Sequence, residues 1–358
     1  MKYLGWVWST IKFGILFHGT RCPVGLTSSD PSTRRVPGNF SMPNNENPAA
    51  PRIVVVGSIN MDLVARMVQL PRPGETVSGD SFQTIPGGKG ANQAVAARRL
   101  GANVFMVGRL GEDSFGTILR EHLIADGIET SHVFSTPSCS SGVALIGVES
   151  SGANCITVIP GANGQLTVQD VEASLGLITH AKAIIVQLES PTPAIAAAIQ
   201  FAQQNGVLTV LDPAPAPPGR LPQELMRVDV LSPNQTEAEA LTGIVVHDWE
   251  TAAQAASDLQ QHGAKDVVLK LGSLGAFVAT RDGHTVRVNA IPTNIVDTTA
   301  AGDAFTAALT VALCEGRSLP EAAKFGCLAG TLACTRFGAQ PAMPTRDELE
   351  KWSNSRLV

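Results

Sequence analysis

Two glycine-rich turns, each followed by a helix-like segment, carry residue types suited to phosphate and hydroxyl chemistry. One of them, Asp297-Thr-Thr-Ala-Ala-Gly-Asp303, precedes the apolar segment 304–314. Small residues let backbone N–H groups approach an anion closely, and the helix dipole favours negative charge at the amino end. A carboxylate beside such a turn suits phosphoryl transfer, because it takes the proton of a hydroxyl while the N–H groups hold phosphoryl oxygens. Asp303 fits an ordinary helix cap equally well, so these residues alone leave both interpretations open.

The other turn, Gly87-Gly-Lys-Gly-Ala-Asn-Gln93, matches neither of two common phosphate motifs. A P-loop needs Ser or Thr after its Gly-Lys pair, and here a glycine follows the lysine. A dinucleotide fingerprint of glycines would follow the first strand-like segment, where Gly57-Ser-Ile-Asn60 stands instead. The polar residues Lys89, Asn92 and Gln93 favour hydroxyl recognition at a helix N-terminus, with a purely structural tight turn as the alternative.

The elements that must position these turns alternate between strand-like and helix-like segments. Continuous β-branched runs separated by helices predict a parallel sheet covered on both faces. Segments 61–86 and 140–159 differ, because short alternating runs with Gly and Pro turns predict a small β-layer that covers the sheet's carboxyl edge as a lid. The expected strands are 53–57, 103–107, 183–187, 207–211, 228–231 and 266–270, and the expected helices are 90–100, 115–126, 193–204, 236–241 and 250–261.

Composition excludes several classes of protein. The 358 residues are 44% hydrophobic and 16% charged, which excludes a mostly disordered chain. A net charge of −5 argues against a nucleic-acid binder, which normally carries a basic footprint. The six cysteines are scattered without a Cys-x-x-Cys pair, and the sequence has no cluster with zinc-site spacing. We therefore expect a soluble metabolic enzyme with reduced, structural thiols.

Residues 1–51 differ from the rest of the chain. Residues 1–41 are basic with one acid, Asp30, and Lys12 interrupts their apolar stretch, which is shorter than the roughly 18 apolar residues of a membrane-spanning helix. We interpret residues 1–51 as an extension and linker, either disordered or a targeting segment. An overlong gene start before Met42 is slightly favoured over an organelle transit peptide.

From about Arg52 to Arg346 the chain resembles the ribokinase/phosphofructokinase-B family of carbohydrate kinases. The resemblance implies a kinase domain over residues 52–350, with a three-layer αβα fold, a mainly parallel central sheet and a small β-sheet lid. Each motif alone is weak, but together, in the family's order, they are highly specific. The motifs are Gly57-Ser-Ile-Asn-Met-Asp62, Pro73-Gly-Glu-Thr76, Gly87 to Gln93, Gln187-Leu-Glu-Ser-Pro191, Asn234-Gln-Thr-Glu237, Leu271-Gly-Ser-Leu-Gly275 and Asp297 to Asp303.

The resemblance implies ATP-dependent phosphorylation of D-ribose at O5, which gives D-ribose 5-phosphate and ADP. Related kinases of deoxyribose, fructose or adenosine are alternatives. A non-catalytic sugar-binding relative is another, although the intact Asp303 turn argues against it. The resemblance also implies Mg²⁺ and K⁺ as cofactors, a homodimer formed through the lid, no nucleic acid and no membrane. The implied location is the cytoplasm, or an organelle if residues 1–41 are a transit peptide.

The site residues follow from the same resemblance. Asp303 is implied as the catalytic base and Gly302 as the residue that closes the anion hole. Carboxylates and amides suit a pentose, because its hydroxyls both donate and accept hydrogen bonds. The implied sugar contacts are Asn60, Asp62, Gly88, Lys89, Asn92, Ala144, Val158, Glu189 and Asp303. The implied nucleotide contacts are Asn234, Lys270, Leu271, Gly272, Ser273, Leu274, Gly275, Gly302, Asp303 and Cys327, and Glu237 is implied to hold magnesium through water.

A monovalent-cation site is a further implication of the resemblance. It would use the Asp297 side chain and the carbonyl of Thr299. The remaining implied positions are the carbonyls of Cys334, Phe337 and Ala339, together with Ala342. In the family a Ser hydroxyl is often found where Ala342 stands, so water would have to replace that ligand here.

Overall fold

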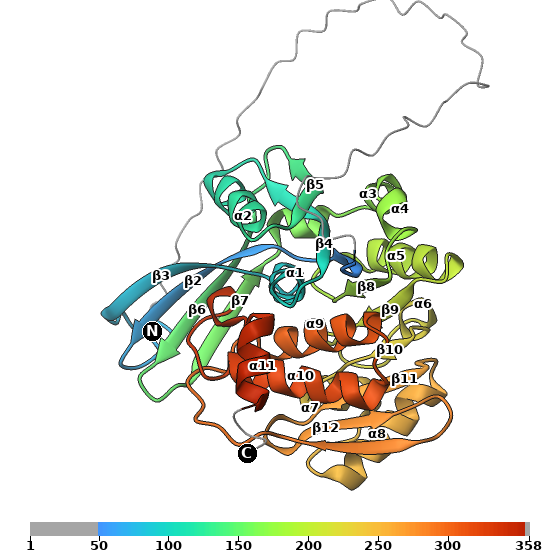
Figure 1. The fold of residues 1–358 in the computed structure, drawn as a ribbon. Coiled ribbons are helices and arrows are strands. Elements are labelled where there is room, and N and C mark those ends of the chain that lie inside the picture. Colours follow the sequence, from blue (N-terminus) through green and yellow to red (C-terminus); the bar gives the residue numbers. More distant parts are fainter. Residues whose placement is uncertain (1–48, 355–358) are drawn as a thin grey trace, which may run out of the picture. The chain divides into compact units, whose positions relative to one another are not determined.

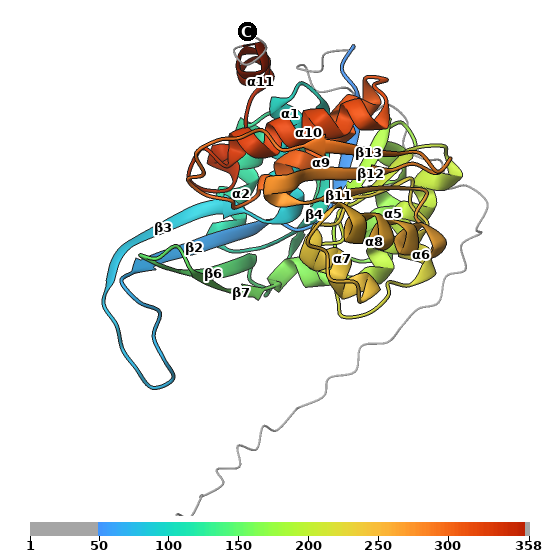
Figure 2. The ribbon, with the colours of Figure 1, turned by 90° about the horizontal axis from the view of Figure 1, so that it is seen from below.

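The computed structural model describes residues 49–354, in which a nine-stranded sheet lies between two layers of helices (Figures 1 and 2). The strand order is β13-β12-β11-β10-β9-β8-β1-β4-β5. The predicted three-layer fold with a mainly parallel sheet is confirmed. The strands are β1 (Arg52–Val56), β4 (Asn103–Gly111), β5 (Glu129–Thr136), β8 (Ala183–Val186), β9 (Leu208–Leu211), β10 (Val230–Leu231), β11 (Asp266–Lys270), β12 (Gly275–Ala279) and β13 (Thr285–Asn289).

Three strands were not among the expected elements: β5 at one edge of the sheet, and β12 and β13 at the other. β12 and β13 run antiparallel to β11 and to each other, whereas the other neighbours are parallel. β12 begins only five residues after the end of β11, which is too short for the crossover helix that a parallel neighbour needs. An antiparallel edge on an otherwise parallel sheet is common in large α/β folds.

The sheet supplies two hydrophobic cores because side chains alternate across a strand. In β1, Ile53 and Val55 join one core while Val54 and Val56 join the other, and all four are fully buried. The first core is covered by α1 (Lys89–Arg99), α2 (Ser114–Ala125), α9 (Ala301–Cys314), α10 (Leu319–Ala333) and α11 (Arg346–Asn354). The second is covered by α3 (Val168–Ala173), α4 (Leu175–Ile178), α5 (Thr192–Gln204), α6 (Gln223–Met226), α7 (Gln235–Thr242) and α8 (Trp249–Gln261).

A separate four-stranded sheet extends to one side of the molecule (Figure 2). Its strands are β2 (Asn60–Met67), β3 (Gly79–Gly87), β6 (Gly142–Glu149) and β7 (Asn154–Ile159), in the order β3-β2-β6-β7. These strands lie in the two segments, 61–86 and 140–159, from which a small lid was expected. β2 leads directly from the carboxyl end of β1, so the sheet begins where the central strands end.

The described cysteines are free thiols, as expected for structural residues. Burial raises the pKa of both Cys314 and Cys327 to about 12, so these thiols stay protonated and unreactive at neutral pH. Cys22 lies outside the described residues. None of the helices within residues 49–354 combines the length and apolar character that a membrane-crossing segment requires.

Removal of residues 1–41 should not affect the folded domain. A chain that starts at Met42 is expected to fold and to melt at the same temperature as the full chain, because the first core strand begins only at Arg52. The expected extension, residues 1–51, falls almost wholly outside the described residues. Calorimetry of both chains tests this prediction, and a melting temperature several degrees lower for the short chain would assign the extension to the fold.

Candidate active site

Polar residues from several parts of the chain meet at the carboxyl edge of the central sheet. Lys270 is the last residue of β11, Asp212 directly follows β9, and Glu189 lies shortly after the end of β8. Asn60 follows β1 and is the first residue of β2. Because these strands are parallel, their carboxyl ends lie along one edge, which is where open α/β sheets bind ligands. The amino ends of α1 and α9 complete the site, and α1 packs against α9.

Asp303 lies at the centre of this site, in the first turn of α9. The helix begins at Ala301, earlier than the expected start of the apolar segment. The Asp303 carboxylate accepts hydrogen bonds from Asn92 Nδ2 at 2.9 Å and from Gln93 Nε2 at 3.2 Å. Burial raises the pKa of Asp303 to about 6, against the opposing effect of the Lys89 ammonium. The group is therefore ionised at neutral pH yet more basic than an ordinary aspartate.

The turn before Asp303 has the backbone shape of an anion site. Ala300 adopts a left-handed conformation with a φ of 58°, which costs a non-glycine residue roughly 1–2 kcal/mol. The N–H groups of Gly302 and Asp303 belong to the first helical turn, whose donors have no intrahelical partner. A Cβ on Gly302 would lie 3.6 Å from Lys270 Nζ, so an ammonium group stands directly beside this turn.

The side of the site that holds the predicted sugar contacts is built from buried carboxylates and amides. Ser58 Oγ donates to Glu189 at 2.5 Å, and Asn163 Nδ2 donates to Asn60 Oδ1 at 2.7 Å. This hydrogen bond from Asn163 fixes the orientation of the Asn60 amide. Burial raises the pKa of Asp62 to about 7, and repulsion from the carboxylates of Glu189 and Asp303 adds to the effect.

The Lys89 ammonium offsets this concentration of negative charge. Although burial opposes it, the nearby carboxylates hold the pKa of Lys89 above its usual value. Gly88, one residue earlier, has a φ of 87°, and a Cβ there would lie 2.6 Å from the backbone nitrogen of Asn60. The turn therefore requires glycine at this position, so that α1 can begin against the start of the lid.

The lid carries three of the predicted sugar residues in one row. Asp62 of β2 pairs with Ala144 of β6, and Ala144 pairs with Val158 of β7. Residues opposite each other on neighbouring strands share a face of the sheet. Asp62 and Ala144 are buried, whereas the Val158 side chain is 45% exposed.

A pocket of about 770 Å³ extends from Asp303 along the carboxyl edge toward α7 and α10. Asn234 caps α7, and its backbone and side-chain nitrogens donate hydrogen bonds to the Glu237 carboxylate. Burial raises the pKa of Glu237, although the Lys270 ammonium opposes this rise. The predicted nucleotide residues that line it are Asn234, Lys270, Gly272, Ser273, Gly275, Gly302, Asp303 and Cys327. Leu271 and Leu274 instead pack with the second hydrophobic core.

Sequence reasoning missed the buried residues that support this site. Asp212, only 2% exposed, accepts from Lys270 Nζ at 2.8 Å, Gln93 Nε2 at 2.9 Å and Thr306 Oγ1 at 3.2 Å. The position of Asp212 directly after an apolar strand was a usable signal, because such strand ends form ligand sites. Gln93, expected to recognise a hydroxyl, instead donates to both Asp212 and Asp303 and accepts from Gln187.

The residues implied to hold a monovalent cation come from the segment before the Gly302 turn and from the end of α10 and the segment after it, and hydrogen bonds join the two parts. The Asp297 carboxylate accepts from the backbone N–H groups of Thr299 at 2.9 Å and Gly338 at 3.0 Å. Although burial opposes it, these hydrogen bonds hold the pKa of Asp297 below its ordinary value, so the group stays ionised. The Cys334 carbonyl accepts from the N–H groups of residues 296 and 297, and Ala342 is fully buried without a hydroxyl.

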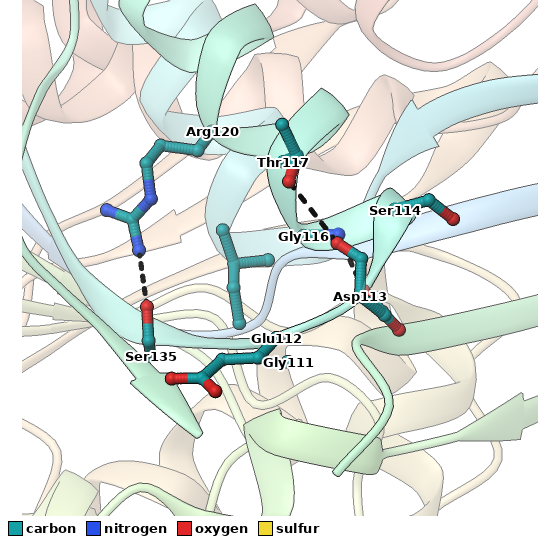
Figure 3. Close-up of a pocket in the computed structure, with 9 residues that line it drawn as sticks. Gly111, Glu112, Asp113, Ser114, Gly116, Thr117, Arg120 and Ser135 are labelled. Atoms are coloured by element: carbon teal, nitrogen blue, oxygen red, sulfur yellow. Dashed lines mark hydrogen bonds between the residues drawn. The ribbon is translucent and has the colours of Figure 1, made fainter. Parts of the chain in front are cut away.

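A second, smaller pocket of about 460 Å³ lies beside the amino end of α2 (Figure 3). Asp113 accepts from Gly116 N at 2.7 Å and from Ser141 N at 2.8 Å, so it caps α2 and fixes the start of β6. On the opposite wall Arg120 points toward Ser135. The lining of this pocket includes none of the predicted site residues.

Comparison with known proteins shows the family. The model of the pfkB family of carbohydrate kinases matches residues 50–346. Ribokinase of Haemophilus influenzae is 40% identical over 297 residues, which cover 83% of this chain and 96% of that protein. Deoxyribokinase of Salmonella typhimurium is 34% identical, over 84% of this chain and 98% of that protein. The structure of Arabidopsis thaliana ribokinase complexed with ribose and ATP is 36% identical, with a TM-score of 0.77, over 84% of this chain and 98% of that one. The chain therefore belongs to the pfkB family of carbohydrate kinases.

Proposed function

We propose that the chain is a phosphotransferase that uses ATP to phosphorylate D-ribose at O5, giving D-ribose 5-phosphate and ADP. The observation that carries this proposal is the position of Asp303. Its buried carboxylate lies between a cluster of sugar-suited side chains and the 770 Å³ pocket, at the amino end of α9. The similarity to ribokinases over more than four fifths of the chain supports ribose and ATP as the two substrates.

The site residues divide the reaction between them. The Asp303 carboxylate takes the proton of the ribose O5 hydroxyl while O5 bonds to the γ-phosphorus of ATP. The bond from that phosphorus to the bridging oxygen breaks, and its electron pair leaves with ADP. The N–H groups of the Gly302 turn hold the oxygens of the phosphoryl group during transfer, where charge is spread over them.

The sugar site would select ribose through its fixed donors and acceptors. Asn163 fixes the orientation of Asn60 as a donor, and Asn92 Oδ1 is a buried acceptor with no hydrogen-bond partner within residues 49–354. An unpaired buried acceptor costs about 1–3 kcal/mol, which a sugar hydroxyl recovers when it donates there. A sugar that lacks the matching hydroxyl leaves the cost in place, so the site discriminates by hydrogen bonding.

Deoxyribose is the second candidate substrate, because a deoxyribokinase is among the relatives that are more than 30% identical. A panel of ribose, 2-deoxyribose, fructose and adenosine, each with ATP and magnesium, tests the proposal by ADP release. We expect ribose to give the highest kcat/KM. A higher value for deoxyribose would overturn the sugar assignment, and ADP release that no sugar stimulates would overturn the kinase reaction itself.

Magnesium is the proposed divalent cofactor, and Glu237 with Asn234 would hold it through water. Each Glu237 carboxylate oxygen accepts one hydrogen bond from Asn234, so each keeps acceptor capacity toward the pocket. The described residues contain no cluster of three or more metal-ligating side chains, which fits a metal carried mainly by phosphates and water. When bound, magnesium neutralises charge on the β and γ phosphate oxygens.

Potassium is the proposed monovalent cofactor, held by Asp297 and the carbonyls of Thr299, Cys334, Phe337 and Ala339. We expect potassium to raise both the melting temperature and the turnover of the wild-type chain, because a cation bound only by the folded state stabilises it. Asp297→Ala should remove both responses. Scanning calorimetry in potassium and in tetramethylammonium chloride measures the first response, and equal shifts for both proteins would contradict the site.

The pH dependence of ribose phosphorylation should reflect two carboxylates. Because burial raises the pKa of Asp62 to about 7 and that of Asp303 to about 6, both groups take up protons just below neutral pH. Protonation removes an acceptor for the sugar and then the base, so kcat/KM falls below pH 7 and falls more steeply below pH 6. A profile that stays flat from about pH 8 to about pH 5 would contradict these roles.

We propose that two chains pair through their lids. Every residue of β7 is exposed, and the exposed apolar side chains of the lid include Phe82, Leu145, Ile156 and Val158. Sedimentation analysis at several concentrations tests for the dimer.

We also propose a cytoplasmic location for the protein. A processed amino terminus in the native protein would favour an organelle instead.

A further inference from the structure

A buried ion pair opens onto the nucleotide pocket at the end of β11. Lys270 Nζ lies 2.8 Å from Asp212 Oδ1 and 3.5 Å from Thr306 Oγ1. The Lys270 side chain is 11% exposed and that of Asp212 only 2%. Burying such a pair seldom stabilises a protein more than apolar packing would, so its position needs another explanation.

The free side of the Lys270 ammonium faces the proposed phosphoryl position. A Cβ on Gly302 would lie 3.6 Å from Nζ, which is an ordinary van der Waals distance. Lys89 and Lys270 are the cationic residues among those described as lining the pocket, against the carboxylates of Asp212, Glu237 and Asp303. A phosphoryl group at this turn would therefore meet the Lys270 ammonium directly.

The same ion pair is connected to the base by one amide. Gln93 Nε2 donates to Asp212 Oδ2 and to Asp303 Oδ1, and Gln93 Oε1 accepts from Gln187 Nε2 at 2.6 Å. Both amide hydrogens and the amide oxygen are used, so the Gln93 side chain cannot rotate without losing hydrogen bonds. The distance between the base and the ion pair is thus fixed by fully buried contacts.

We propose that Lys270 is a catalytic residue whose ammonium contacts the phosphoryl group as it passes from ATP to the sugar, and that Asp212 and Gln93 are positioning residues. This inference rests on the proposed phosphoryl transfer. The sugar proton goes to Asp303, the new bond joins O5 to phosphorus, and the electron pair of the broken bond leaves with ADP. Lys270 keeps its proton throughout and neutralises charge on the phosphoryl oxygens, where a fixed donor acts most strongly.

Two variants distinguish a catalytic role of Lys270 from a role in balancing the charge of Asp212. One removes the ammonium alone, and the other removes both charges. Lys270→Met leaves Asp212 buried without its ammonium partner, which by itself lowers stability. The double variant Asp212→Asn, Lys270→Met removes both charges and should recover most of the melting temperature. We expect kcat of the double variant to stay about 100-fold below wild type, with the KM for ribose nearly unchanged, as for the loss of one transition-state donor.

Lys265→Met is the matched control, because Lys265 pairs with Asp229 at 2.7 Å at the opposite edge of the same sheet. Its kcat should equal that of wild type. If the double variant recovers kcat to within about 3-fold of wild type, Lys270 only balances Asp212 and the inference is wrong. Wild-type ribose phosphorylation is measured first, so a failure of the proposed reaction is recognised separately.

If the double variant does not fold, the affinities of Lys270→Met for ATP and for ADP test the inference. An ammonium at the γ-phosphoryl position contacts ATP and not ADP, so Lys270→Met should weaken ATP binding at least about 5-fold more than ADP binding. Calorimetric titration of wild type and Lys270→Met with each nucleotide gives this ratio. Equal loss of affinity for both nucleotides would overturn the inference.

Discussion

Replacement of Asp303 by Asn is expected to lower the turnover of ribose phosphorylation by a factor of about 100 or more, the usual cost of a lost general base. Asn has nearly the same shape as Asp, and the N-cap of α9 is Ala300, so the substitution leaves the helix cap unchanged. The carboxamide oxygen of the new Asn can still accept the hydrogen bond that Asn92 Nδ2 donates, which leaves Asn92 Oδ1 available to the sugar. Ribose and ATP should therefore still bind with roughly wild-type affinity.

The measurement for Asp303→Asn combines turnover with binding. Steady-state kinetics give kcat, and calorimetric titration gives the ribose and ATP affinities of the same preparation. Near-wild-type turnover would mean that Asp303 only accepts hydrogen bonds from Asn92 and Gln93 and is not the base. Loss of turnover together with loss of ribose affinity and of melting temperature would mean that the substitution disturbs the site instead of removing a base.

Replacement of Asp62 by Ala is expected to weaken ribose binding by about 2–5 kcal/mol, because it removes one partner of a buried, charged hydrogen-bond set. The Asp62 carboxylate lies close against Gly87 at the root of the lid, where burial and the carboxylates of Glu189 and Asp303 already act on it. ATP affinity measured without sugar should hardly change, since Asp62 does not line the nucleotide pocket.

Titration of Asp62→Ala with ribose and, separately, with ATP tests this assignment. Asp113→Ala is a useful comparison, because that carboxylate fixes the start of β6 without lining the active site. Equal loss of ribose affinity in both variants would point to the lid's position as the cause. Unaltered ribose affinity in Asp62→Ala would remove Asp62 from the sugar site.

The sequence carried enough information to predict the fold class and the main strands. Continuous β-branched runs such as 183–187 and 266–270 became buried parallel strands because both faces of the sheet are covered. Short alternating runs became the lid sheet, whose outer strands β3 and β7 are largely exposed on both faces. The antiparallel pair β12 and β13 escaped prediction because a short hairpin after β11 carries no helix to mark it.

The residues proposed to contact ligands were easier to recognise in the sequence than the residues that hold them in place. Asp303 and Lys89 stand beside recognisable turns, whereas Asp212, Gln187 and Asn163 act through partners that lie more than fifty residues away in sequence. Long-range hydrogen bonds leave no local spacing pattern, so only the folded chain brings these groups together. The sequence predicted that Gln93 contacts a hydroxyl. Its hydrogen bonds to Asp212 and Asp303 were missed because both partners are distant in sequence.

Leu271 and Leu274 belong to a motif whose residues have different surroundings in the folded chain. Both stand within the segment 271–275 that the family resemblance assigned to the nucleotide, and the short turn η2 (Gly272–Leu274) follows directly from β11. Within such a turn only some side chains face the pocket. Gly272 and Ser273 line it, while the two leucines contribute to the second hydrophobic core.

Phosphorus NMR of the wild-type chain with ribose, ATP and magnesium tests the central claim most directly. The proposed reaction predicts a sugar phosphate bonded at O5, formed in equal amount to ADP, and neither product in appreciable amount with Asp303→Asn. ADP formed together with inorganic phosphate, or a phosphate bonded at another ribose oxygen, would contradict phosphoryl transfer to O5 at the Asp303 turn.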